Sequence, residues 1–163
     1  MSRRRLLILI ADGEHGRLVR PAADNALRTE RALDSILAHR RAADLTSDRP
    51  GASFHSGASA RHAETPRHDP HDLAKETFAE ALADHLNQTE AAGAFDDLVL
   101  VAPAQVMAAI RQHLGDASSR RIIGTLLKDL VKVPDEALAP HLAEWVRPVQ
   151  RRGGSRAAGG GGI

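Results

Sequence analysis

Residues 98–102, LVLVA, decide the fold class of this chain. A short run without polar residues predicts a strand buried on both faces, as in the sheets of α/β proteins. Pro103 follows directly and suits the first turn of a helix, where its missing N–H costs no hydrogen bond. The next residues place Met107, Ile110 and Leu114 at helical spacing, so a buried strand is followed by an amphipathic helix.

The same pattern repeats towards the C-terminus. Residues 122–127 predict another strand, which ends at Lys128 and Asp129. A last helix is expected after Pro134, either kinked or late in starting, because Pro140 lies inside it. Its inward positions are Leu138, Leu142, Trp145 and Val146.

Towards the N-terminus, the patterns predict strands without intervening helices. Residues 6–11 are a continuous apolar run and predict a buried strand. Gly13 and Gly16 permit a tight reversal before a second, alternating strand at 17–20. Residues 27–33 predict a third strand, whose charges place it at an edge or on one wet face.

The longest helix is expected to open at Asp69 and Pro70 and to end at Gly93, a residue that readily takes the left-handed conformation. Its buried stripe is predicted from a repeat at every fourth residue, Ala74, Phe78, Leu82 and Leu86, with Ala81 beside it.

The fold class is therefore α/β. We expect a single domain over residues 1–147, with a mixed β-sheet in which an N-terminal antiparallel meander is followed by βαβα and helices cover the sheet. Residues 148–163 are rich in Arg and Gly and too poor in apolar residues to fold, which predicts a disordered tail.

The composition excludes several classes of protein. The chain has no cysteine, which excludes disulfides, thiol catalysis and thiolate zinc sites. Three Phe and one Trp are too few for the stacking surfaces of sequence-independent single-strand binders. The apolar run at 6–11 is too short for a secretory leader, and no segment reaches the ~20 apolar residues of a membrane span. We expect a cytoplasmic protein with no membrane insertion and no cofactor.

Residues 45–62, LTSDRPGASFHSGASARH, form a polar connection far longer than the usual ~4–6 residues. Arg49 and Arg61 within it, and Arg67 beyond it, offer paired donors to phosphate, and Gly51 lets a backbone approach closely. The segment therefore predicts a surface that binds an anion or nucleic acid. The alternative is that these arginines only solvate the loop or pair with Asp12 and Asp129.

Further basic residues cluster at Arg3 to Arg5, at Arg40 and Arg41, and from Arg147 into the tail. Such clusters raise local affinity for anions, although exposed arginines often serve only as solubilising charge.

Several stretches occur in a characteristic order together with Arg17, Arg61 and His62: LILIADG, SDRPGASFHS, DPHDLAKETFAEALADHLN, FDDLVLVAP and LLKDL. With these motifs the chain resembles the bacterial host attachment protein family, described as proteins required for attachment to host cells. The resemblance covers nearly all of the folded part. The chain departs from the family pattern at Ala52, at His55 and in LLKDLV, which weakens any charge-pair chemistry built there.

Members of that family are distantly similar to the middle domain of archaeal and eukaryotic peptide-chain release factors. The resemblance implies the same order of meander, loop, long helix and strand-helix-strand unit, and a setting that involves RNA or the ribosome. The loop at 46–62 stands where a release factor carries Gly-Gly-Gln. This sequence contains no Gly-Gly-Gln, so peptidyl-tRNA hydrolysis is not expected.

Asp12 follows the first strand, and Lys128 and Asp129 follow the last one, at the sheet edge where α/β proteins bind ligands. If the two strands are neighbours, these groups converge with Arg49 or Arg61, and the carboxylates offer ligands for Mg²⁺ in a metal-dependent hydrolase. The favoured alternative is that Asp12 caps a turn, while Lys128 and Asp129 pair with loop arginines.

Two further kinds of site are not favoured. His62, His68 and His71 do not follow a zinc spacing, and Asp69 with Asp72 suit the start of a helix instead. The serines near His55 lack the G-x-S-x-G motif of a hydrolase. No metal site is predicted.

The leading hypothesis is a non-catalytic, release-factor-like binding module that engages RNA or the ribosome through residues 46–62. The alternatives are a protein-interaction module required indirectly for attachment to host cells and a hydrolase that uses Asp12 and Asp129. The oligomeric state stays open. The candidate binding residues are Asp12, Arg17, Asp48, Arg49, Gly51, Phe54, Arg61, His62, Lys128 and Asp129.

Overall fold

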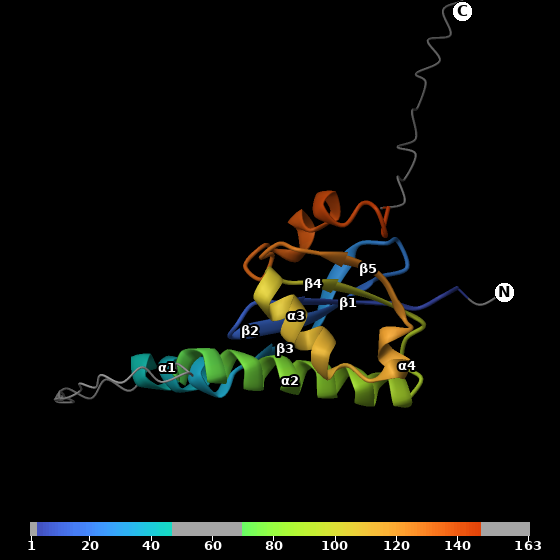
Figure 1. Ribbon diagram of the computed structural model, residues 1–163. Helices are drawn as coiled ribbons and strands as arrows, with labels where there is room; N and C mark the ends of the chain where they lie inside the picture. Colours follow the sequence, from blue (N-terminus) through green and yellow to red (C-terminus); the bar gives the residue numbers. More distant parts are fainter. Residues whose placement is uncertain (1–2, 47–69, 148–163) are drawn as a thin grey trace, which may run out of the picture.

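The computed structural model describes residues 3–46 and 70–147 of the chain (Figure 1). Within them a five-stranded sheet has the order β3-β2-β1-β4-β5, so the first strand lies at the centre. The strands are β1 Leu6–Ala11, β2 His15–Pro21, β3 Leu27–Asp34, β4 Asp97–Val101 and β5 Ile122–Leu126. The helices are α1 Ile36–Thr46, α2 Pro70–Ala91, α3 Ala104–His113 and α4 Asp116–Ser119, followed by the 3-10 helices η1 Asp135–Ala137 and η2 Ala139–His141.

β1, β2 and β3 form the antiparallel meander that the sequence predicts. Ile10 of β1 pairs with Arg17 of β2. The reversal into β3 uses Asn25, whose φ of 63° lies in the left-handed region, and Asp24, whose Oδ1 accepts the Ala26 N–H at 3.0 Å. Asn and Asp commonly occupy such turns because their short polar side chains bond to the local backbone.

The C-terminal half supplies the parallel part of the sheet. β4 pairs in parallel with β1 on one side and with β5 on the other, and α3 and α4 connect β4 to β5. Residues 98–102 are fully buried, as expected for a strand covered on both faces. The fold is a single α/β domain with a mixed sheet, which confirms the predicted class.

Side chains alternate between the two faces of the sheet and build two cores. Leu7, Leu9, Leu98 and Leu100 pack against α2 and α3. Ile8, Ile10, Val99 and Val101 pack against the segment that follows β5, and the two layers lie on opposite sides of the sheet in Figure 1.

The long helix α2 begins at Pro70 and ends just before Gly93, whose φ is 69°, as the sequence predicts. Phe78, Leu82 and Leu86 are buried. Ala81 does not belong to this stripe, because it is exposed, and Ala79 and Ala83 are buried instead.

The prediction of a last helix is wrong in one respect: the segment contains the short turns η1 and η2 and no α-helix. Pro140 explains the difference, because it lacks an N–H and its ring clashes with the preceding helical turn. Leu138, Leu142 and Val146 are nevertheless buried as expected, whereas Trp145 is only partly buried. The Trp145 ring covers Gly124 so closely that a Cβ there would lie 2.2 Å from Nε1.

The helix α1 was not expected from the sequence. It begins after Ser35, whose buried Oγ accepts the Ala38 N–H at 3.0 Å and so caps the helix N-terminus. The Ser35 N–H also donates to the Glu14 carbonyl at 2.7 Å, which fixes the start of α1 against the first reversal. The short helix α4 was likewise not expected.

Candidate functional site: an apolar groove between α1 and α2

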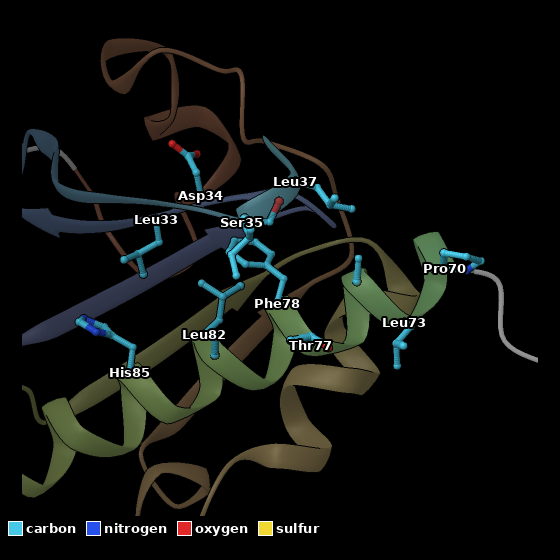
Figure 2. Close-up of a pocket in the computed structure, with 13 residues that line it drawn as sticks. Leu33, Asp34, Ser35, Leu37, Pro70, Leu73, Thr77, Phe78, Leu82 and His85 are labelled. Atoms are coloured by element: carbon cyan, nitrogen blue, oxygen red, sulfur yellow. The ribbon is translucent and has the colours of Figure 1, made fainter. Parts of the chain in front are cut away.

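A groove of about 480 Å³ lies between the start of α1 and the N-terminal two-thirds of α2 (Figure 2). α2 contributes residues spaced three and four apart, which share one side of a helix. The end of β3 and the first turn of α1 form the opposite wall. The lining residues are Leu33, Asp34, Ser35, Ile36, Leu37, Pro70, Leu73, Ala74, Thr77, Phe78, Ala81, Leu82 and His85.

The groove is predominantly apolar, and large side chains at its mouth are open to solvent. Ile36 is 70% exposed and Leu73 is 57% exposed. Phe78 and Leu82 line the groove and also belong to the buried core, so the floor of the groove is part of that core. Such a contiguous apolar surface typically marks an interaction site.

Polar groups are confined to the ends and rims of the groove. His85 lies at one end, and burial lowers the pKa of its imidazole, with the nearby Arg31 charge acting in the same direction. The neutral form is therefore favoured in the folded protein. Ser35 contributes little free polarity, because its hydroxyl oxygen already accepts the Ala38 N–H.

The rims carry opposite charges. On α1, His39 and Arg40 are exposed. On α2, Glu80 and Asp84 are exposed one helical turn apart. The groove thus has an apolar floor, with the basic residues of α1 and the lining carboxylate of Asp34 on one side and acidic residues of α2 on the other.

Asp12, Lys128 and Asp129 do not share a site through neighbouring strands, because β4 lies between β1 and β5. Asp12 Oδ1 accepts the N–H groups of Glu14 at 2.8 Å and His15 at 2.6 Å, which is the turn-capping role given as the alternative. Asp129 Oδ1 accepts the Val131 N–H at 3.2 Å, and Lys128 is exposed. This geometry gives no support to a hydrolase built on Asp12 and Asp129.

A second, more polar groove of about 540 Å³ lies beside Gly13, at the carboxyl ends of β1 and β4. The side chain of Lys75 from α2 packs over Gly13, where a Cβ would lie 2.8 Å from Lys75 Cγ. Asp72 and Glu76 line the same groove, so the Lys75 ammonium group has carboxylates as neighbours and the groove is not a basic pocket.

Arg17 lies on the sheet face covered by the C-terminal segment, with a side chain only 13% exposed. Its guanidinium donates to Asp135 Oδ1 at 3.0 Å, to the Leu130 carbonyl at 2.8 Å and to the Val133 carbonyl. Burial lowers the pKa of Arg17, although the Asp135 charge opposes that shift. Arg17 thus fastens the segment after β5 to the sheet, and this role leaves little of its charge for an external ligand.

The N-terminal arginines are partly neutralised within the chain. Arg4 makes two hydrogen bonds to Asp97, at 2.8 and 2.6 Å, and Arg5 pairs with Asp96 at 3.4 Å. Hydrogen bonds from the Arg5 backbone and side chain lower the pKa of Asp96. The basic run at 3–5 is therefore a weaker anion-binding candidate than its sequence indicates.

The remaining candidates, Asp48, Arg49, Gly51, Phe54, Arg61 and His62, lie outside the described residues, as does the tail at 148–163. The segment that contains them joins the end of α1 to the start of α2, the two helices of the groove. Among residues 3–46 and 70–147, no group of three or more His, Asp or Glu side chains is placed to hold a metal ion. No helix in those ranges is long and apolar enough to cross a membrane.

Sequence reasoning missed the groove residues Ile36, Leu37, Leu73 and Thr77. The available signal was Ser35 followed by the apolar residues Ile36 and Leu37, a helix N-cap before an apolar turn. Asp135, the partner of Arg17, was also missed because the two are adjacent only in the folded chain.

The fold and its exposed groove define a small mixed α/β protein. The model of the family described as "Protein required for attachment to host cells" matches residues 7–142, so this chain belongs to that family. The resemblance seen in the motifs is thereby confirmed.

Among solved structures, an archaeal translation termination factor, aRF1, is similar to 90% of this chain, with 12% sequence identity and a TM-score of 0.44. The chain spans 36% of the length of that factor. No curated protein matches the chain.

Proposed function

We propose that this family member is a cytoplasmic binding module that engages RNA, free or on the ribosome, through residues 46–62. Arg49 and Arg61 are the principal phosphate contacts in this proposal. The observation that carries it is the place of residues 46–62 in the chain, directly between α1 and α2, with Arg49 and Arg61 and with Asp48 as the one acidic residue of that sequence stretch. No peptidyl-tRNA hydrolysis is proposed, because the sequence contains no Gly-Gly-Gln.

The physical basis is the match between arginine and phosphate. A guanidinium group donates two parallel hydrogen bonds to a phosphate, and each neutralised phosphate releases counterions. The logarithm of the binding constant falls linearly with the logarithm of the salt concentration, with a slope of about 0.7 for each single-strand phosphate contact.

The test compares the full chain with an Arg49→Ala/Arg61→Ala variant in binding to a mixed-sequence RNA and in co-sedimentation with ribosomes. We expect weaker binding and a smaller salt slope, by about one to two units. Arg111→Ala/Arg120→Ala is the matched control, because both arginines are exposed on other elements. If the loop variant binds and sediments like the unmodified protein, the proposal fails.

A second candidate function is a protein-interaction module that acts indirectly in attachment to host cells. The groove between α1 and α2 favours it, because an apolar recess with Ile36 and Leu73 at its mouth suits a protein surface. This function predicts a complex that survives nuclease treatment and is lost in Leu73→Glu. An association that disappears with nuclease would instead favour the RNA-binding function.

A further inference from the structure

We infer that the groove between α1 and α2 is the interface of a homodimer, in which the two helices of one chain pack against those of a second copy. This inference does not depend on RNA binding. It concerns the described residues of the groove and commits to a second copy of this chain as its occupant.

Exposed apolar side chains are concentrated at the groove. Ile36, Leu73, Ile123 and Leu127 are the large apolar side chains at least half exposed among the described residues, and two of these four border the groove. The recess beside them holds about 480 Å³ and is lined by Leu33, Leu37, Phe78 and Leu82. The same patch therefore presents both protruding apolar side chains and a cavity that accepts such side chains.

That combination favours a second copy over an unrelated occupant. In a twofold interface the same patch serves both partners, so it has to be complementary to itself. Ile36 at the mouth of one groove is suited to the recess of the other, and the reverse contact follows by symmetry. In Figure 1, α1 and the first turns of α2 reach beyond the strands.

The two helices that border the groove are complementary in charge. α1 exposes His39 and Arg40, whereas α2 exposes Glu80 and Asp84 in the same row as the lining residues Leu73 and Thr77. When α1 of one chain crosses α2 of its partner, basic and acidic residues meet at both ends of the interface. The acidic residues on α2 also disfavour RNA as the occupant, since they repel phosphate.

The groove extends along both helices to different degrees. Its α2 wall runs from Pro70 to His85, about 24 Å at ~1.5 Å per residue, and its α1 wall is the first turn with Ile36 and Leu37. Two such helix pairs, related by a twofold axis, form a four-helix contact around one apolar centre.

The first test measures the mass of the full chain by sedimentation equilibrium over a concentration series up to ~100 μM. At that concentration even a dimer with a Kd of ~10 μM is mostly formed. We expect a dimer for the unmodified chain and at least a tenfold weaker dimer for Leu73→Glu and Ile36→Glu. Leu127→Glu is the matched control, because Leu127 is 61% exposed but does not line the groove. Circular dichroism of each variant establishes that the fold is kept.

The second test reverses charges. Arg40→Glu alone and Glu80→Arg/Asp84→Arg alone should each weaken self-association several-fold, whereas an equimolar mixture of the two variants should form a heterodimer as stable as the unmodified dimer.

A chain that stays monomeric throughout the concentration series overturns the inference and leaves the groove to a different protein. Unchanged association in Leu73→Glu overturns it as well, because the dimer then uses another surface. Arg49→Ala/Arg61→Ala, which tests RNA binding, should leave the dimer intact, so the two proposals fail separately.

Discussion

The helix α1 and the segment from Leu130 to Val146 are attached to the sheet in opposite ways. α1 is a regular helix of 11 residues, yet among its described side chains only Ala38 is buried. The C-terminal segment has no α-helix, yet it buries Leu130, Leu138, Leu142 and Val146 on the sheet. Regular backbone hydrogen bonding and attachment to the body are therefore separate properties of a segment.

Buried side chains and shared polar contacts account for the difference. Arg17 bonds the C-terminal segment through Asp135 and two carbonyls, and Asp135 also accepts the Thr29 N–H at 2.8 Å and the Thr29 hydroxyl at 2.6 Å. At the first turn of α1, Ser35 caps the helix by accepting the Ala38 N–H, and its own N–H donates to the Glu14 carbonyl. The segment with fewer buried side chains among its described residues is the one that borders the groove.

The largest expected effect comes from removing apolar contacts in the segment from Leu130 to Val146. Leu142→Ala should lower the free energy of unfolding by about 2–5 kcal/mol, because Leu142 is fully buried and the loss leaves a cavity. Ile36→Ala should change it by less than ~0.5 kcal/mol, because that side chain is largely exposed. Urea unfolding at low protein concentration measures both, and equal effects would refute the comparison.

The next effect comes from the bonds of Arg17. Arg17→Met should cost about 2 kcal/mol, because it removes the charged hydrogen bonds from the guanidinium to Asp135 and to the Leu130 and Val133 carbonyls. Arg111→Met, at an exposed site on α3, is the control and should be nearly neutral. Hydrogen exchange should show the loss of protection concentrated in residues 130–146. Uniform loss across α2 and α3 would contradict a role for Arg17 in fastening this segment.

Asp135 adds a pH dependence to this cluster. Burial acts to raise the pKa of its carboxyl, but hydrogen bonds from Thr29 and the charges of Arg17 and Arg28 outweigh burial and lower it. A carboxyl with a lowered folded-state pKa stabilises the protein above its unfolded pKa of ~3.9, and this stabilisation is lost as pH falls through the folded value. Melting temperatures between pH ~5 and ~2 should therefore fall less steeply for Asp135→Asn than for the unmodified chain.

The smallest effect concerns the capped start of α1. Ser35→Ala removes the acceptor for the Ala38 N–H and should lower the stability of α1 by about 1 kcal/mol. The main observable is faster amide hydrogen exchange in α1. Ser119→Ala, at an exposed position, serves as the control. Equal loss of protection in α1 and α2 would show that α1 is coupled to the body more tightly than its few buried side chains indicate.

Most of the fold follows from local patterns in the sequence. The apolar runs at 6–11 and 98–102 predict buried strands because few other structures bury every side chain of so short a run. Pro70 and Gly93 mark the ends of α2 through their backbone preferences. The helix α1 was missed because it lacks a long apolar repeat, and its only strong local signal is the cap at Ser35.

The candidate site could not be derived in the same way. Leu73 is out of register with the buried residues Phe78, Leu82 and Leu86, so the apolar repeat of α2 gave no reason to single it out, and its place beside the groove depends on the position of α1. The predicted convergence of Asp12 with Asp129 required neighbouring strands, but periodicity does not give the order of strands in a sheet, and β4 lies between them. The sequence offered Arg17 as a candidate binding residue, while its partner Asp135 becomes visible only in three dimensions.

The central position of β1 also has a consequence for synthesis of the chain. Leu6 pairs with Asp97 and Ile10 with Val101, so the middle of the sheet stays open until β4 has emerged from the ribosome. Pairings this distant along the chain slow folding, and the early hairpins meanwhile expose apolar side chains to water. The sheet is therefore expected to be completed only after the second half of the chain has been translated.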